Sequence, residues 1–192
     1  MSLEHATPPR VPQEGERMKV NNVDIKAAGA FVEQAKADPS VARKSKRVEG
    51  RWDFTEGQPQ FSATMAHKTG ETTVRADFAP FMGGEGLAPD PIQYCLYGLA
   101  ACYAGTFVGL AAAQGVVLRS LSVVAENRVD LSRSLGISDA PVVEQVSLSL
   151  QVDTDAGESQ LAELERLARE RCPGVYCLSN PIPVEFHLRR GA

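Results

Sequence analysis

The residues of this chain that are best suited to covalent chemistry are its four cysteines, Cys95, Cys102, Cys172 and Cys177. Within each pair they are seven and five positions apart, so neither pair forms the C-x-x-C motif of many redox proteins. The three histidines include no pair at metal-ligand spacing, and the sequence has no G-x-S-x-G, P-loop or H-E-x-x-H motif. We therefore expect thiol chemistry, with no metal and no cofactor.

Cys102 lies in a stretch with helical spacing, on the same face as Leu99 and Thr106, and Cys95 lies one heptad earlier. A cysteine on an apolar helical face is more often a small core residue than a catalyst. Burial also disfavours the thiolate, so a reactive Cys102 needs a cation nearby. The spacing fits either a core residue or a nucleophile.

Cys172 falls at the end of a second helical pattern, on the apolar face that carries Leu161 and Ala168. Pro173 follows directly and is not tolerated inside a helix, so the helix must break there. Cys172 could then cap a short following turn, whose free backbone N–H groups favour a thiolate. The alternative is a buried thiol at a helix end.

The element that positions Cys102 is a helix predicted over about 91–114. Asp90 is the expected N-cap, Pro91 takes the first helical position, and Gln93 completes a capping box. No residue from Pro91 to Leu118 is charged, a length that could span a bilayer, but the stretch is rich in Ala and Gly. We therefore expect a helix buried on nearly all sides within a protein, and no membrane.

The remaining patterns predict an α+β fold of segregated antiparallel hairpins. Asn22 could cap a short helix that ends before Pro39, and the glycines at 83–86 indicate a turn or hinge. A further helix is expected over 158–171. The predicted strands are 46–54, 58–68, 71–79, 119–130, 142–153 and 183–189.

Composition narrows the setting of this fold. The net charge of -4 argues against nucleic acid, which needs a basic face. Residues 1–20 have no apolar secretory region and are expected to form a loose tail. Four cysteines are too few for a disulfide scaffold in a chain of this length, so we expect free thiols in the cytoplasm. The basic run 43–47 is expected to be a solvated face.

Three parts of the sequence together resemble the OsmC/Ohr family, the osmotically inducible protein C-like and organic hydroperoxide resistance proteins. They are Gly83-Gly84, the segment PIQYCLYGLAAC from Pro91 to Cys102, and the later Arg171-Cys172-Pro173. The resemblance covers about residues 46–190. It implies an OsmC-like domain over 46–192, preceded by an N-terminal tail and short helix over 1–45. It also implies an intertwined homodimer with its active sites at the subunit interface.

The resemblance implies a thiol peroxidase, with Cys102 as the peroxidatic and Cys172 as the resolving cysteine. A thiolate would attack the O–O bond of an organic peroxide and become a sulfenic acid, and the second thiol would condense with it to a disulfide. An external dithiol would restore both thiols by exchange. In this role the protein would act in defence against oxidative stress.

The sequence departs from the family at one activating position. Many members have a glutamate where this chain has Ile92, and that glutamate orients an arginine beside the reactive thiol. Arg47, Arg51 and Arg75 are candidates for the arginine. Cys95 and Cys177 are extra thiols, of which Cys177 could compete as the resolving partner. The alternative function is a non-catalytic OsmC-like binding or stress-associated protein, in which Cys102 stays protonated.

Overall fold

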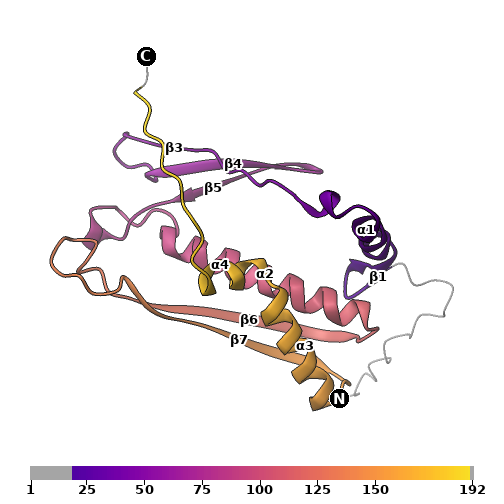
Figure 1. Ribbon diagram of the computed structural model, residues 1–192. Helices are drawn as coiled ribbons and strands as arrows, with labels where there is room; N and C mark the ends of the chain where they lie inside the picture. The colour runs from indigo at the N-terminus through magenta and orange to yellow at the C-terminus, as the bar shows by residue number, and fades with distance from the viewer. Residues whose placement is uncertain (1–18, 191–192) are drawn as a thin grey trace, which may run out of the picture.

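A computed structural model describes residues 19–190, and within them small antiparallel sheets combine with four α-helices (Figure 1). The mixed α+β class is therefore confirmed. Helix α2, Pro91–Ala113, runs between a layer made by the β3–β5 sheet and a layer made by the β6–β7 hairpin (Figure 1). The predicted loose tail lies, for residues 1–18, outside the described residues.

Helix α2 begins as the sequence predicts. Asp90 accepts a hydrogen bond from the Ile92 N–H at 2.8 Å, and the Gln93 side chain accepts one from the Asp90 N–H at 2.9 Å. This reciprocal capping box satisfies backbone donors that have no partner inside the helix. The helix ends before Gly115, which has a φ of 71° that favours glycine.

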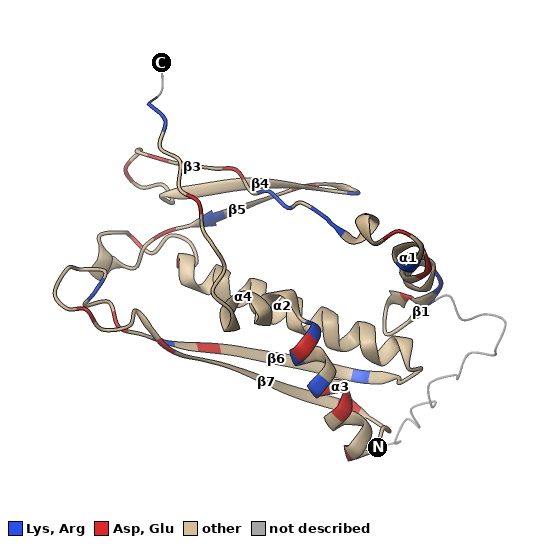
Figure 2. Cartoon of the chain, viewed as in Figure 1, with Lys and Arg blue, Asp and Glu red and all other residues tan. Residues whose placement is uncertain are grey.

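Only one stripe of α2 is buried within the chain, so the prediction of a helix buried on nearly all sides is wrong for a single copy. The buried side chains are Leu99, Tyr103, Phe107, Ala111 and Ala112. Helix α2 carries no charged side chain, and Figure 2 shows it in tan beside the red and blue of α3. Its length and composition alone would let it cross a membrane, a test that core helices of soluble proteins also pass.

The main core lies between α2, the β6–β7 hairpin and α3, Glu158–Arg171. Strands β6, Leu118–Val129, and β7, Val143–Thr154, form the two predicted antiparallel strands. Their alternation turns Leu121, Leu148 and Leu150 toward α2 and α3. Phe107, Leu164, Ala168 and Cys172 are buried at the centre of this cluster.

The second layer contains the first three predicted strands, in the order β3–β4–β5. They are β3, Gly50–Trp52, β4, Phe61–His67, and β5, Gly70–Ala76. A short 3-10 helix, η2, Pro80–Met82, then leads into the expected glycine turn. Gly83 and Gly86 have positive φ angles there, and a Cβ on Gly84 would collide with the Phe78 carbonyl.

The N-terminal helix α1, Ile25–Ala37, is capped by Asp24 and not by Asn22, which corrects the sequence prediction. Asn22 instead lies with Asn21 in the turn between the short strands β1, Lys19–Val20, and β2, Val23–Asp24. Both asparagines have positive φ, a conformation that Asn tolerates better than most residues. A 3-10 helix, η1, Pro39–Ala42, follows α1.

The last predicted strand, 183–189, is wrong for the single chain: residues 181–190 have no regular secondary structure. Its apolar side chains, among them Phe186 and Leu188, are exposed. The alternating pattern is present, but a strand also needs a neighbouring edge for its backbone hydrogen bonds. The last regular element of the described residues is therefore a short helix, α4, Pro173–Ser179, which directly follows α3.

Replacing Leu164 with alanine tests the assignment of the core. Leu164 is 0% exposed, so Leu164→Ala is expected to lower the free energy of unfolding by about 2–5 kcal/mol because it leaves a cavity. Urea unfolding followed by circular dichroism measures the change. Leu135→Ala, in an exposed loop, is the control and should change the free energy by less than about 0.5 kcal/mol. Equal losses in the two variants would contradict the assignment.

Candidate functional site

The structure brings Cys102 and Cys172 together where α4 packs against α2. Cys172 ends α3 and takes the N-cap position of α4, after the helix break predicted from Pro173. Its side chain makes no capping hydrogen bond and is fully buried, as in the alternative of a buried thiol at a helix end. Gly174 permits the close approach of the two helices, because a Cβ there would lie 3.3 Å from the Cys102 Cβ, which is tighter than an ordinary contact. Cys102 is half-buried, and both thiols are free.

The surroundings of Cys102 favour the protonated thiol within one chain. Burial raises the pKa of Cys102, and the Cys172 thiol, through its hydrogen bond to Cys102, raises it further, whereas the backbone N–H of Gly174 opposes them. Cys177 also raises the pKa by like charge. No arginine or lysine of residues 19–190 is among these main influences. The described part of a single chain therefore provides two adjacent thiols without the cation that a reactive thiolate needs.

None of the three arginines proposed from the sequence is placed beside the Cys102 thiol. Arg47 pairs with Glu49 at 2.6 Å on the exposed segment that precedes β3. Arg51 and Arg75 lie on β3 and β5, and both are register partners of Ser62 on the central strand β4. Because cross-strand partners point to the same face, these two arginines share one face of the sheet.

A cavity of about 800 Å³ adjoins the thiol pair between α2, α4 and the β6–β7 hairpin. Its size is that of a small-molecule pocket. Leu99 lines the cavity and also lies beside Gly174 and so links the cavity to the thiols, although neither Cys102 nor Cys172 lines it. The apolar part of its wall includes Leu96, Leu99, Val146, Leu148, Val175 and Leu178.

Three polar side chains at the edge of this cavity were not predicted from the sequence. The Tyr103 hydroxyl donates a hydrogen bond to Glu165 at 3.3 Å, and Glu165 pairs with Arg169 at 3.5 Å. Burial and the Glu165 charge raise the pKa of Tyr103 to about 12, so the phenol remains a donor. Glu165 and Arg169 are four positions apart in the last two helical turns before Cys172. That i,i+4 spacing was the sequence signal from which this ion pair could have been predicted.

The two extra thiols take different positions. Cys95 is exposed and lines the same cavity. Cys177 is also exposed and follows Gly174 by one turn of α4, so it lies near Cys102 without being buried beside it. Among the described residues, no group of three or more histidine, cysteine or acidic side chains could hold a metal ion.

The fold and the paired thiols define a small α+β protein with two cysteines on packed helices, and a family model matches the part of the chain that carries both cysteines. The model is described as OsmC-like protein and covers residues 84–187, just over half of the chain. The chain therefore belongs to the OsmC-like family, among whose structures are organic hydroperoxide resistance proteins. No curated protein matches the chain in sequence.

Solved structures share the fold at low sequence identity. An OsmC-like protein of unknown function from Vibrio cholerae is 18% identical, with a TM-score of 0.53 over 70% of this chain and 94% of its own. The organic hydroperoxide resistance protein OsmC from Legionella pneumophila is 17% identical, with a TM-score of 0.50 over 71% of this chain and 91% of its own. At these identities the similarity shows the fold.

The contact between α4 and Cys102 can be tested at Gly174. Gly174→Val should force α4 away from α2, lowering the free energy of unfolding by about 1–3 kcal/mol and slowing diamide-induced disulfide formation between Cys102 and Cys172. Peptide mass spectrometry after alkylation measures the disulfide. Gly29→Val, on α1 with open space around it, is the matched control and should leave the oxidation rate unchanged. Equal oxidation rates in both variants would show that this contact does not position the thiols.

Proposed function

We propose that the protein is a thiol peroxidase that reduces organic hydroperoxides, with Cys102 as the peroxidatic and Cys172 as the resolving cysteine. The observation that carries this proposal is the meeting of the two thiols at the contact between α2 and α4, where Gly174 packs against Cys102. Membership of the OsmC-like family supports it. Two adjacent thiols on packed helices are what a disulfide-forming peroxidase requires.

The proposed reaction has three steps: oxidation of Cys102, formation of the disulfide, and its reduction by a dithiol. The Cys102 thiolate attacks the outer oxygen of ROOH, the O–O bond breaks, and the products are the Cys102 sulfenic acid and ROH after protonation. The Cys172 thiol then displaces the sulfenic oxygen as water and forms the Cys102–Cys172 disulfide. Finally, an external dithiol is oxidised to its own disulfide as both protein thiols are restored.

The cavity beside the thiols favours organic substrates over hydrogen peroxide. Its apolar side chains, including Leu99 and Val175, can cover the carbon part of a peroxide, while the Tyr103 hydroxyl provides a polar edge. Burial of each substrate CH₂ group there contributes about 0.8 kcal/mol. The proposed setting is the cytoplasm, where thiols stay reduced between turnovers.

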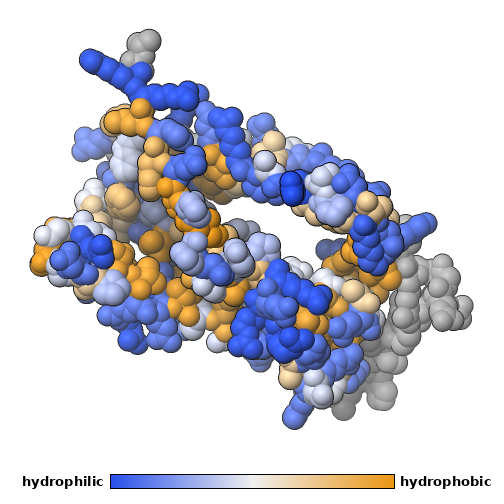
Figure 3. Space-filling view, in the orientation of Figure 1, coloured by the Kyte–Doolittle hydropathy of each residue, from blue (hydrophilic) through white to orange (hydrophobic). Residues whose placement is uncertain are grey.

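We also propose that the active form is a homodimer in which a second copy covers α2. Only five residues of the uncharged helix α2 are buried in one chain, and the others are half-buried or exposed. The space-filling view shows an opening between the layer that carries the β3–β5 sheet and the layer that carries α2, with apolar atoms at its edge (Figure 3). The apolar side chains of 183–189 are also left without a partner strand within residues 19–190.

A second copy can supply the cation that residues 19–190 of one chain do not place beside Cys102. Arg51 and Arg75 lie on one face of the β3–β5 sheet, so the same sheet face presents two guanidinium groups. An arginine placed beside Cys102 would lower the pKa of the thiol and offset the effect of burial. It would do so without the family glutamate, whose position is taken by Ile92.

Oxidation by one equivalent of cumene hydroperoxide tests the chemistry. We expect the reduced protein to lose two hydrogens in intact mass, because both thiols are oxidised, and peptide mapping should locate a Cys102–Cys172 disulfide that a dithiol reverses. Cys177→Ser should react in the same way, because Cys177 is not the proposed resolving residue. Cys172→Ser should accumulate oxidised Cys102 without a disulfide to position 172.

Two outcomes of this experiment would change the assignment. A disulfide between Cys102 and Cys177 would make Cys177 the resolving residue. If both Cys102 and Cys172 stay reduced while a known peroxidase reacts in parallel, the non-catalytic alternative replaces the enzyme proposal. The raised pKa of Cys102 and the presence of Ile92 are the observations that favour that alternative.

Complementation between two inactive variants tests the shared site. One variant carries Cys102→Ser, and the other carries Arg51→Met together with Arg75→Met. Each alone should be inactive, because it lacks either the nucleophile or the cation, whereas co-expressed chains should regain peroxidase activity. In a mixed dimer, the sheet of the first variant would supply the arginines to the Cys102 of the second.

Co-expression of Cys102→Ser with Cys172→Ser is the control for this experiment, because both changes affect the thiol pair of one chain. That pair of variants should stay inactive. Native mass spectrometry shows whether the co-expressed chains form mixed dimers. If they do, but co-expression of Cys102→Ser with the double arginine variant restores no peroxidase activity, the arginines act within their own chain or not at all. If light scattering shows that the protein is a monomer at micromolar concentration, the proposal of a homodimer is wrong.

A further inference from the structure

A second pocket, remote from the thiols, lies between the β3–β4 turn and the glycine turn after β5. It has a volume of about 270 Å³ and is lined by residues from 52–60 and 77–85. Three hydrogen bonds join these segments: the Gly57 N–H donates to Glu85 at 3.3 Å, the Gln60 side chain donates to the Gly83 carbonyl at 3.4 Å, and the Phe78 N–H donates to the Gln60 side chain at 3.1 Å. The pocket is therefore built by two segments that the fold holds together.

Asp77, in the wall of the pocket, has a buried carboxylate oxygen without a partner in the described part of the chain. Asp77 lines the pocket and is 2% exposed. Its Oδ2 accepts hydrogen bonds from the backbone N–H groups of Glu85, at 3.1 Å, and Leu87, at 2.9 Å. Its Oδ1 has no hydrogen-bond partner among residues 19–190. Buried polar atoms are almost always paired, so the free oxygen indicates a missing donor.

The charge of the pocket indicates that the missing donor is positive. Its lining includes Asp53, Glu56, Asp77 and Glu85, with no lysine, arginine or histidine. None of these four carboxylates forms an ion pair with a cation in the described part of the chain. The hydrogen bond from Leu87 lowers the pKa of Asp77, so this buried group is ionised at neutral pH.

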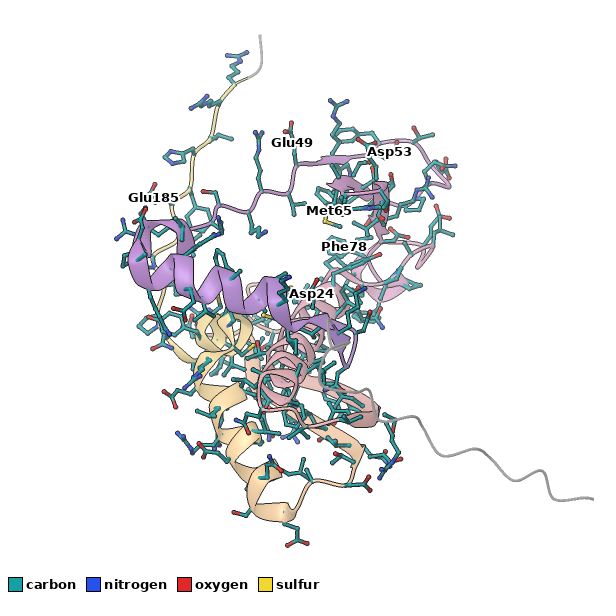
Figure 4. All side chains as sticks on the ribbon, turned by 90° about the vertical axis from the view of Figure 1, so that its right-hand side faces the viewer. Asp24, Glu49, Asp53, Met65, Phe78 and Glu185 are labelled. Carbon is teal, nitrogen blue, oxygen red and sulfur yellow. The ribbon has the colours of Figure 1, made fainter. Side chains whose placement is uncertain are left out.

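Aromatic side chains complete the wall of the pocket. Trp52 and Phe54 line it, and the Trp52 ring packs at 58° to that of Phe78, with 6.1 Å between the centroids. Asp53 and Phe78 lie on the same side of the molecule in Figure 4. Aromatic faces attract organic cations, and tryptophan does so most strongly. A bare metal ion fits less well, because no suitable cluster of ligands exists within residues 19–190.

We infer that this pocket binds a small organic cation with a guanidinium or alkylammonium group. The cationic head pairs with the Asp77 carboxylate and the surrounding carboxylates, which neutralise its charge, and its planar or apolar part lies against Trp52. A guanidinium suits the site well, because it carries several donors in one plane and stacks on aromatic rings. The site is independent of Cys102 and of the proposed peroxidase reaction.

Trp52 makes binding directly measurable, because it is the only tryptophan of the chain. Titration of the full-length protein with ethylguanidinium or ethylammonium should give a saturable change in tryptophan fluorescence that weakens as salt is raised. Ethylurea, of similar shape but neutral, should give no saturable change. A response to ethylurea equal to that of ethylguanidinium would overturn the inference.

Substitutions that keep the shape of the acids but remove their charge test the residues. Asp77→Asn should weaken ethylguanidinium binding roughly tenfold or more, a factor that corresponds to about 1.4 kcal/mol. Its amide oxygen can still accept from Glu85 and Leu87, while its NH₂ group meets the cation. Glu33→Gln on the exposed helix α1 is the matched control and should bind as the unmodified protein does.

Glu85→Gln and Glu56→Gln keep the test decisive if Asp77→Asn does not fold. Each should weaken binding, and in Glu85→Gln the side-chain amide oxygen could still accept the Gly57 N–H. Unchanged affinity in both would overturn the inference. Binding of Mg²⁺ or Ca²⁺ alone, with displacement of ethylguanidinium, would reassign the pocket to a metal. A Trp52 signal that responds to protein dilution but to no added cation would reassign it to an interface between copies.

Discussion

The uncharged surface of helix α2 is the constraint that shapes the whole molecule. Twenty-three residues without a charged side chain must be covered by apolar neighbours, because exposed apolar surface costs roughly 25 cal/mol per Å². In one chain, α3 and the β6–β7 hairpin cover the stripe from Leu99 to Ala112. The remaining faces of α2 are the basis of the proposal that a second copy covers them.

The position of the thiols follows from this same core. Cys172 belongs to the buried cluster with Leu164 and Ala168, so its sulfur is held by core packing and not by a loop. Pro173 then ends α3, and Gly174 lets the next helix approach Cys102 closely. Because reactive groups held on packed elements keep their geometry, the distance between the two thiols depends on the integrity of the core.

The sequence predicts those features that depend on neighbouring residues. The capping box at Asp90 and the break at Pro173 depend on local chemistry, and both are present in the structure. The strand predicted over 183–189 is absent, because alternation specifies two faces but not a pairing edge. The carboxylate pocket was missed for a related reason: Asp53 and Asp77 meet only when two distant turns are brought together. Contacts of this kind depend on how distant segments pair. The position of Arg51 and Arg75 on either side of Ser62, for example, follows from the strand register and not from the local sequence.

Helix α1 is held to the rest of the chain mainly at its base. It has no buried side chain, but the nearby Asn21 side chain donates to the Val116 carbonyl at 2.8 Å and accepts from the Leu118 N–H at 2.9 Å. The amide group of Asn21 thus takes the place of a strand partner at the start of β6. Thirteen helical residues without a buried face are marginally stable on their own. The helix can therefore unfold locally while Asn21 keeps its base attached, so its amides exchange with solvent far sooner than those of α2.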